Sequence, residues 1–416
     1  MRSERIDLVA YLDAPELGEA RPIGVLTRWP GAVLSVAFAY ARSWLDDGDR
    51  RFAIDPNLPV GEAQVTIPGR RLPGVFADTA PDAWGEALME RRAGGRSLDA
   101  RDFMAGVGDE TRMGAIRLRR GTDGPFLDDR EPHVPPIHDL RDVQELARRF
   151  EENPDDIGAA RIAMLVAPGS SLGGARPKAN FRGADGSLWI AKFPATTDRR
   201  DVAAWEHVYA RLARAASVVT PDTQLLSIAG PARTFATRRF DRTDDGRRLY
   251  ASAMTLTGGM DGGMGGGGGG ADYIDIAHAI NTHGATEHVR ADLAQLYRRM
   301  TFNVLAGNRD DHLRNHGFLR HPDGWRLAPA FDLNPAREMR EHATAINGAR
   351  TAPTATDVLD VRSFFGLAER PARGIIRDVA DAVSTWRQVA TDEGVARAEQ
   401  DQVAVALSAL ETAALI

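Results

Sequence analysis

Residues 307–315 read Gly-Asn-Arg-Asp-Asp-His-Leu-Arg-Asn, and residues 331–333 read Phe-Asp-Leu. Asp310 precedes Asn315 by five residues, and a further aspartate, Asp332, follows after a gap of hairpin length. In kinase-type phosphoryl-transfer sites one Asp orients the acceptor hydroxyl and takes its proton, while an Asn and a later Asp hold Mg²⁺ against the ATP phosphates. The spacing therefore predicts the acidic half of such a site.

The flanking sequence predicts that these side chains converge. Apolar residues recur at helical spacing before the stretch and predict a buried helix running to Leu305: Val289, Leu293, Leu296, Met300 and Val304. Gly307 suits the left-handed residue that ends a helix. Residues 317–320 and 325–328 read as short strands around a Pro-Asp-Gly turn. Such a hairpin brings Asn315 beside Asp332, as two oxygen ligands of Mg²⁺ must be.

Two other interpretations of this stretch are open. A solvated acidic loop beside an ordinary hairpin has the same sequence features, because charged residues gather on surfaces. Zinc binding by His312 and His316 is disfavoured, since no helix or His-Glu-x-x-His frame surrounds them. The kinase interpretation therefore depends on a matching basic half.

Composition limits the class of protein. A chain of 416 residues predicts two or three domains, and 43% hydrophobic with 26% charged residues is ordinary for a soluble globular protein. The net charge of −6 and a pI near 6.0 do not favour direct nucleic-acid binding. The absence of cysteine excludes disulfides and thiolate chemistry and fits a reducing cytoplasm. No apolar leader or membrane-length run is present, so we expect a soluble, cytoplasmic protein.

The N-terminal part reads as a mixed α/β module without catalytic spacing. Residues 6–12, 33–40 and 63–68 are expected strands, and a helix is expected to begin near Pro81. Residues 121–136 are rich in Pro, Asp and Gly and read as a connector, followed by a short amphipathic helix at 143–150. Packing or partner binding is the expected role of this module.

A candidate basic half begins at residues 168–178, which read Pro-Gly-Ser-Ser-Leu-Gly-Gly-Ala-Arg-Pro-Lys. Glycines let backbone N–H groups approach phosphate oxygens, although many such loops are only turns, and the Walker A order is missing. The following strand, 188–193, carries Lys192, and Glu206 lies beside the apolar stripe of the next helix. A strand Lys paired with a helix Glu clamps ATP phosphates in kinases. Taken singly they fit a snorkelling lysine and a solvated glutamate, but the order of all the motifs favours a kinase.

The remaining segments complete this interpretation. Residues 233–242 read as a strand entering a polar segment, where a two-lobed kinase has its adenine hinge; Phe240 is alternatively plain core. The glycine tract at 258–270 is expected to be a mobile loop and is assigned no chemistry. A mostly helical half is expected from residue 273, with an Ala-rich helical tail at 358–415.

The combined motifs resemble the HipA family, the kinase toxins of bacterial toxin–antitoxin modules. The resemblance covers nearly the whole chain and lies in these segments: 72–84, 113–115, 170–178, 239–242, 252–256, 308–315 and 331–333. It implies an α+β, two-lobed protein-kinase-like fold with an N-terminal HipA-type α/β subdomain. The implied parts are the subdomain at 1–135, a kinase N-lobe at 136–243 and a helical C-lobe at 244–416.

The resemblance also implies ATP, Mg²⁺ and roles for individual residues. Asp310 is the implied catalytic base, Asn315 and Asp332 the metal ligands, and Lys192 the ATP-phosphate lysine supported by Glu206. The other implied nucleotide-binding residues are Gly173, Gly174, Ala175, Arg176 and Lys178 of the phosphate loop, Arg238, Phe240 and Asp241 of the hinge, and His312. Ser171 or its neighbour Ser170 matches a serine that is autophosphorylated in the family.

The implied function is a serine/threonine-protein kinase toxin that is held by a small DNA-binding antitoxin of HipB type and contacts DNA only through it. Its implied substrate is a translation component such as an aminoacyl-tRNA synthetase. Two departures matter: Asp311 stands where some members carry a small residue, and the glycine tract falls in a variable loop. The alternatives are a small-molecule phosphotransferase of aminoglycoside-kinase type and a non-catalytic corepressor subunit.

Overall fold

The computed structural model describes residues 6–28, 36–66, 72–127, 134–158, 161, 164–165, 176–259, 270–348 and 351–416. The chain forms two compact units. Unit 1 consists of residues 1–196 and 241–251, and unit 2 of residues 197–240 and 252–416. The chain therefore leaves unit 1 after Thr196, returns to it at Asp241 and leaves it again after Ala251.

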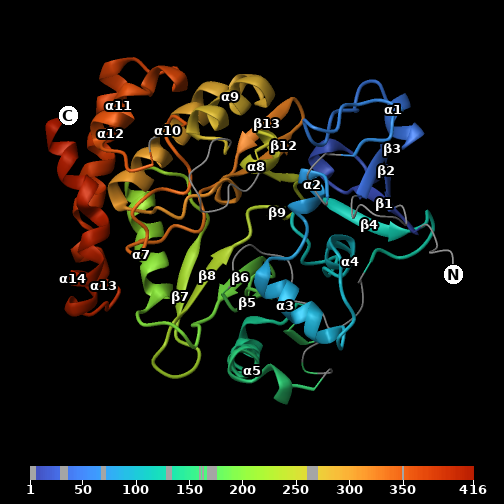
Figure 1. The fold of residues 1–416 in the computed structure, drawn as a ribbon, viewed down its shortest axis with the longest axis horizontal. Coiled ribbons are helices and arrows are strands. Elements are labelled where there is room, and N and C mark those ends of the chain that lie inside the picture. Colours follow the sequence, from blue (N-terminus) through green and yellow to red (C-terminus); the bar gives the residue numbers. More distant parts are fainter. Residues whose placement is uncertain are drawn as a thin grey trace. The chain divides into compact units, whose positions relative to one another are not determined.

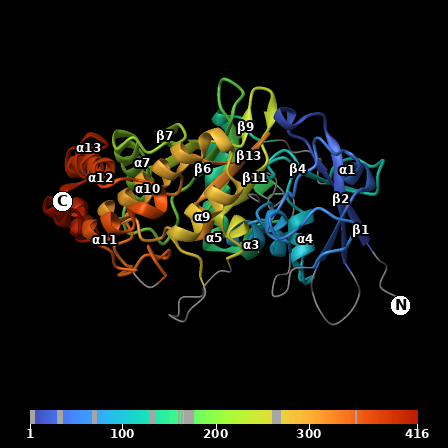
Figure 2. The ribbon, with the colours of Figure 1, turned by 90° about the horizontal axis from the view of Figure 1, so that it is seen from above.

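Unit 1 begins with an antiparallel four-stranded sheet (Figures 1 and 2). Its strand order is β3-β2-β1-β4, with bounds Val36–Tyr40, Arg21–Arg28, Ile6–Leu12 and Ile116–Arg120. The prediction of β1 is confirmed. Strands β2 and β4 were missed, because arginines and a proline interrupt their apolar pattern. Of the described residues in the predicted strand 63–68, Val65 makes an isolated bridge to Phe38.

One face of this sheet and the helices that follow it share a core. Leu8, Ala10 and Leu12, which alternate along β1, are buried, and Val9 between them is buried as well. Phe38 of β3 packs on Phe76 with ring centroids 5.2 Å apart. The helices of this part are α1 (Arg42–Asp46), α2 (Gly74–Ala77), α3 (Ala83–Arg92) and α4 (Ala100–Ala105), with the short 3₁₀ helix η1 at Pro15–Leu17.

The rest of unit 1 contains one longer helix and a hairpin. Helix α5 spans Leu140–Glu152, between the 3₁₀ helices η2 (Ile137–Asp139) and η3 (Pro154–Asp156), and confirms the helix predicted at 143–150. The hairpin consists of β5 (Lys178–Arg182) and β6 (Leu188–Lys192). The returning segment 241–251 contributes β9 (Arg242–Thr243), β10 (Gly246–Arg247) and the start of β11 (Tyr250–Ser252).

Unit 2 begins with a helix and a hairpin. Helix α7 (Val202–Ala215) starts at Asp201, whose side chain accepts a hydrogen bond from the N–H of Ala204 at 2.9 Å. Its apolar stripe, including Trp205 and Tyr209, is fully buried. Strands β7 (Thr223–Leu226) and β8 (Thr234–Arg238) form the hairpin, and β8 matches the strand predicted from 233.

The helical half of unit 2 is arranged around α10 (Val289–Ala306), which packs against α9 and α12 (Figure 1). The other elements are α8 (Ala253–Leu256), α9 (Tyr273–His283), η4 (Thr286–His288), η5 (Leu313–Asn315), β12 (Gly317–His321), β13 (Gly324–Leu327), α11 (Ala355–Asp360), η6 (Arg362–Phe365), α12 (Glu369–Ser384), α13 (Trp386–Asp392), α14 (Arg397–Val403) and the 3₁₀ helix η7 (Ala404–Leu415). The predicted helical half and tail are confirmed. Within the described ranges, no helix is both long and apolar enough to cross a membrane.

Candidate active site

The acidic loop, which we define as residues 307–315, begins where α10 ends. Gly307 has φ +68°, as predicted for the residue after the helix, and a Cβ there would lie 2.0 Å from the carbonyl oxygen of Ala406. Asn308 is buried and donates from Nδ2 to Oδ1 of Asn303 at 3.0 Å, which ties the loop to the last turn of the helix. The predicted hairpin β12–β13 follows, paired from Phe318–Leu327 to His321–Gly324. The loop is therefore fixed at both ends.

Asp310 and Asn315 are directly coupled. The Nδ2 group of Asn315 donates a hydrogen bond to the main-chain oxygen of Asp310 at 2.7 Å. Asp310 reaches solvent, yet the surrounding protein desolvates its carboxyl and raises its pKa, and nearby Asp332 and Asp311 raise it further, while His312 acts in the opposite direction. The carboxylates of Asp310 and Asp332 are thus close enough to repel each other. Asp310 lies in the loop before the β12–β13 hairpin and Asp332 in the segment after it.

Asp332 has an unusual backbone. Its φ is +58°, and in the described part of the chain only Ser217 shares a left-handed conformation among residues other than glycine. A left-handed aspartate is uncommon and costs conformational energy, so it persists only where its surroundings hold it. The ring of the preceding Phe331 packs against that of Phe240 in a tilted arrangement, with ring centroids 5.5 Å apart. This contact joins the predicted hinge residue to the predicted metal loop within unit 2.

Asp311 has a different environment from its neighbour. It is 1% exposed, and its carboxylate accepts hydrogen bonds from the Tyr273 hydroxyl at 2.7 Å and from the His342 ring nitrogen Nδ1 at 3.1 Å. A buried carboxylate with internal donors has no access to a substrate hydroxyl. The geometry therefore favours Asp310 over Asp311 as the predicted base.

The donor set around Asp310 suits a cation that also binds phosphate. Within the described ranges, no group of three or more His, Cys, Asp or Glu side chains could hold a metal by itself. Mg²⁺ in nucleotide sites is held by one or two protein oxygens, while waters and phosphates complete its shell. One carboxylate and one amide oxygen, from Asp332 and Asn315, fit that pattern. The main-chain oxygen of His312 accepts a hydrogen bond from the N–H of Asn315 at 2.8 Å, and its buried Nδ1 has no hydrogen-bond partner.

Three of the predicted basic residues, Arg176, Lys178 and Lys192, lie in unit 1. Lys178 and Lys192 are direct cross-strand partners in the β5–β6 hairpin, so their side chains leave the same face. Lys178 is 2% exposed and its Nζ lies 2.5 Å from the carboxylate of Asp82, the residue that begins α3. Lys192 is partly exposed. Arg176 donates to the main-chain oxygen of Phe193 at 3.1 Å.

Burial also characterises two other predicted site residues. Glu206 lies on α7 of unit 2 and is 3% exposed. Asp241 lies in unit 1, where its Oδ2 accepts hydrogen bonds from the N–H of Gly114 at 2.7 Å and from Arg242 at 2.6 Å. Asp241 therefore anchors the returning segment, and its nucleotide contact stays a prediction. Arg238 ends β8, and its N–H donates to the main-chain oxygen of Asp222 at 2.9 Å.

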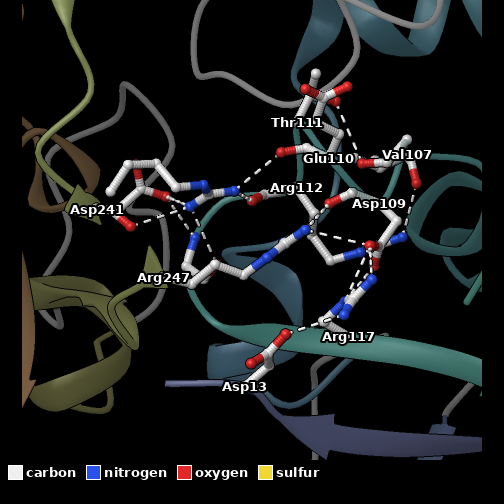
Figure 3. A network of polar contacts seen from close by, with 12 residues as sticks. Asp13, Val107, Asp109, Glu110, Thr111, Arg112, Arg117, Asp241 and Arg247 are labelled. Carbon is white, nitrogen blue, oxygen red and sulfur yellow. Dashed lines mark hydrogen bonds and ion pairs between the residues drawn. The ribbon is translucent and has the colours of Figure 1, made fainter. Parts of the chain in front are cut away.

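The returning segment 241–251 is held by a second carboxylate, Asp109 (Figure 3). Asp109 accepts hydrogen bonds from Arg117 of β4 at 2.9 Å and from Arg247 of β10 at 3.2 Å. Arg117 also donates to Asp13 at 2.9 Å. Asp109 is buried, and the two arginines that compensate its negative charge, Arg117 and Arg247, also belong to unit 1.

Several predicted positions lie outside the described residues. They are Gly173, Gly174 and Ala175 of the phosphate loop, Ser170 and Ser171, and residues 260–269 of the glycine tract. Sequence reasoning also missed the residues that support the acidic loop: Tyr273, Asn303, Asn308, His342 and Thr344. The available signal was two amides five residues apart, Asn303 in the last turn of α10 and Asn308 just after its end.

Together, the α+β fold and an Asp-x₄-Asn loop, followed by a hairpin and an Asp, define a protein of kinase-like architecture. Residues 17–119 match the family model of the HipA N-terminal domain, and residues 170–386 match that of the HipA-like C-terminal domain. The chain belongs to the HipA family. This confirms the resemblance read from the sequence.

Solved and curated relatives agree with this assignment. A chain in the structure of the Shewanella oneidensis MR-1 toxin–antitoxin system HipA, HipB and its operator DNA superposes with a TM-score of 0.69, covering 97% of this chain and 96% of that one at 18% identity. This likeness shows the fold and confirms the predicted fold class. A putative kinase of Haemophilus influenzae is 30% identical over 31% of this chain, and putative kinase Y4dM of Sinorhizobium fredii is 28% identical over 49%. The matches span 39% and 52% of those relatives.

Proposed function

We propose that this protein is an ATP- and Mg²⁺-dependent serine/threonine-protein kinase and the toxin of a toxin–antitoxin module. The observation that supports the proposal is the hydrogen bond in unit 2 from Asn315 to the main chain of Asp310, whose carboxyl also lies within the electrostatic influence of Asp332. The putative kinases similar to parts of the chain support the same activity.

In the proposed reaction each acidic-loop residue has one task. Asp310 orients the acceptor hydroxyl and accepts its proton, for which its exposed carboxyl is suited. Asn315 uses its Nδ2 to fix the Asp310 main chain, which leaves its amide oxygen as a ligand beside Asp332. Bound Mg²⁺ supplies charge neutralisation of the ATP phosphates. Lys192 with Glu206, the loop 173–178, the hinge 238–241 and His312 are proposed to bind the nucleotide.

The biological setting is proposed from family membership. The similar solved chain belongs to a complex of HipA, HipB and operator DNA, which supports a HipB-type antitoxin as the partner and DNA contact through that partner. The proposed substrate is a hydroxyl of a translation component such as an aminoacyl-tRNA synthetase, and the proposed location is the cytoplasm. We also propose that Ser171 or Ser170 is autophosphorylated.

Labelled ATP tests the proposal. Purified protein with Mg²⁺ and no added substrate should label itself at Ser170 or Ser171, located by peptide mass spectrometry, and should label one protein in a lysate. The Asp310→Asn variant should do neither. Label transfer to a small aminoglycoside-type acceptor alone would support a small-molecule phosphotransferase instead. No nucleotide binding, measured by calorimetry, together with antitoxin-dependent DNA binding would support a corepressor.

A further inference from the structure

The segment that follows the predicted metal ligand Asp332 has no regular structure, yet it is held in place. Residues 328–348 contain neither helix nor strand, and a loop of this length in a compact unit is usually functional. Its later part alternates: His342, Thr344 and Ile346 are buried, whereas Glu341, Ala343 and Asn347 are exposed. One edge of the segment therefore packs against protein and the other faces solvent. We call residues 336–346 the docked segment.

The docked segment is bonded to the acidic loop along its length. The N–H of Ala336 donates to the main-chain oxygen of Gly307 at 3.1 Å, and the N–H of Ala343 donates to that of Arg309 at 2.8 Å. The hydroxyl of Thr344 donates to the main-chain oxygen of Asp311 at 2.7 Å. The segment thus runs beside residues 307–311 and donates hydrogen bonds directly to their main-chain oxygens.

The Asp311 carboxylate gathers the remaining donors. One oxygen accepts from the Tyr273 hydroxyl and from Nδ1 of His342, and the other accepts from the N–H of Thr344 at 3.4 Å. Because a carboxylate only accepts, Nδ1 of His342 must carry the hydrogen. Asp311 and the three donor residues are all buried. The donors therefore take the place of the water that would otherwise solvate the negative charge of Asp311.

A second network of hydrogen bonds leads from the Asp311 carboxylate to Asn334, which follows Asp332 and Leu333. The Tyr273 hydroxyl accepts from Nδ2 of Asn303 at 2.8 Å, and Oδ1 of Asn303 accepts from Asn308. Oδ1 of Asn308 then accepts from the N–H of Asn334 at 3.3 Å. Asp311 is therefore linked by hydrogen bonds to Asn334, two residues after the predicted metal ligand Asp332, as well as to the docked segment.

In protein kinases the activation loop, which follows the metal-binding aspartate, is commonly ordered by phosphorylation. The phosphate adds a negative charge to which new hydrogen-bond donors bind. Between residues 331 and 350 this sequence has a single hydroxyl-bearing residue, Thr344. That hydroxyl is 1% exposed and already bonded to the acidic loop. The segment consequently offers no exposed hydroxyl for an activating phosphate.

We propose that Asp311 is a positioning residue whose buried carboxylate locks the docked segment against the acidic loop, in place of an activating phosphate. The charge is supplied by the residue next to the base, so docking is complete as soon as unit 2 folds. The inference rests on the proposed kinase function for its effect on rate, but the docking itself does not depend on it.

Hydrogen exchange tests the docking without any activity. In Asp311→Asn, amide exchange at Ala343 and Thr344 should accelerate by at least about tenfold, because two of the donors lose a charged acceptor. Glu341→Gln removes a carboxylate from the exposed edge of the same segment and is the matched control, with wild-type exchange expected. Unchanged exchange in Asp311→Asn, or equal acceleration throughout unit 2, would overturn the proposal.

Kinetics test its consequence. Asp311→Asn should lower kcat for phosphoryl transfer at least about tenfold and leave KM for ATP near that of the wild type, because positioning of the acceptor is lost. Thr344→Val should show a smaller loss and Thr344→Ser should recover it, which keeps the test usable if Asp311→Asn folds poorly. Phosphatase-treated wild-type protein should keep full activity; phosphate found on Thr344 in active protein would overturn the proposal. No transfer by wild type would instead refute the kinase function, while the exchange result would still stand.

Discussion

The side-chain nitrogen of Asn315 donates to the main-chain oxygen of Asp310 at 2.7 Å, across the 3₁₀ turn of η5. This bond explains why five residues separate the two in a kinase-type loop: the turn between them returns the chain so that the amide fixes the backbone of the proposed base. The amide oxygen of Asn315 is not used in this bond, and it is the group that we propose as a Mg²⁺ ligand together with Asp332. The predicted base and the predicted metal ligand are therefore one structural unit.

Replacing the proposed base should abolish activity while the fold stays intact. Asp310→Asn should reduce phosphoryl transfer from labelled ATP by at least about 100-fold, because catalysis here depends on positioning and charge. Its melting temperature should match that of the wild type, since the side chain reaches solvent and its main-chain oxygen still accepts from Asn315. Asp381→Asn, on the exposed side of α12, is the control; equal activity of the two variants would contradict the assignment.

Metal dependence should separate the two proposed ligands. A chelator should stop phosphoryl transfer, and excess Mg²⁺ should restore it. Asn315→Ala should raise the Mg²⁺ concentration needed for half-maximal activity, whereas Asp332→Asn should abolish activity at any Mg²⁺ concentration, because the charged ligand contributes more to binding a hard cation. If neither variant changed the Mg²⁺ titration, the metal would be bound by other groups.

The Lys178–Asp82 pair should be important for the stability of unit 1. Both side chains are almost completely buried, and burial outweighs the attraction of Lys178 so that the pKa of Asp82 is raised. Lys178→Met should destabilise the unit by about 3–5 kcal/mol, because it leaves a buried carboxyl without its partner. The double variant Lys178→Met with Asp82→Asn should lose much less than the sum of the single changes, as measured by denaturant unfolding. Additive losses would show that the pair does not couple.

The local parts of the site could be predicted from the sequence. Helical spacing gave the end of α10, Gly307 gave the left-handed residue, and the Pro-Asp-Gly turn gave the β12–β13 hairpin. Each of these signals is contained within a few residues. The position of the predicted acidic residues, in a loop between a helix and a hairpin, follows from these signals.

The non-local parts could not be predicted in this way. Asp82 and Lys178 are 96 positions apart, and Asp311 and His342 are 31 apart, so no spacing rule connects them. Strand β4 pairs with β1 although it carries three arginines, because its long-range partner and the Arg117–Asp109 contact compensate for its weak apolar pattern. Tertiary contacts overrode local propensity at these positions.

Acid should destabilise unit 2 through His207. Burial lowers its pKa, and Arg211, Arg214 and Arg233 lower it further, although Glu393 acts in the opposite direction. The folded state therefore binds fewer protons at this site than the unfolded chain, whose histidine titrates at about pH 6.5. The stability that neutral His207 contributes is complete above that pH and is lost as the pH falls below it.

The measurement is the melting temperature between pH 7.5 and pH 5.5. The fall in melting temperature should be smaller in His207→Gln than in the wild type, since glutamine does not titrate. His138→Gln, at a side chain that is 77% exposed, serves as the control and should follow the wild type. A wild-type pH dependence in His207→Gln would show that other groups cause the acid loss.

Gly307 should tolerate no side chain, both because its backbone is left-handed and because a Cβ would collide with a neighbouring chain segment. Gly366 allows these two effects to be separated. Gly307 and Gly366 both follow helices with nearly equal angles, φ +68° and +66°, but a Cβ at Gly366 would meet nothing within 4 Å. Gly366→Ala should therefore cost only about 1 kcal/mol, the ordinary penalty of a left-handed alanine. Gly307→Ala should cost several times more, because the Cβ would collide with the main chain of η7 at Ala406 and displace the start of the acidic loop. Denaturant unfolding and phosphoryl transfer should both show the difference; equal losses in the two variants would mean that backbone strain alone accounts for the glycine.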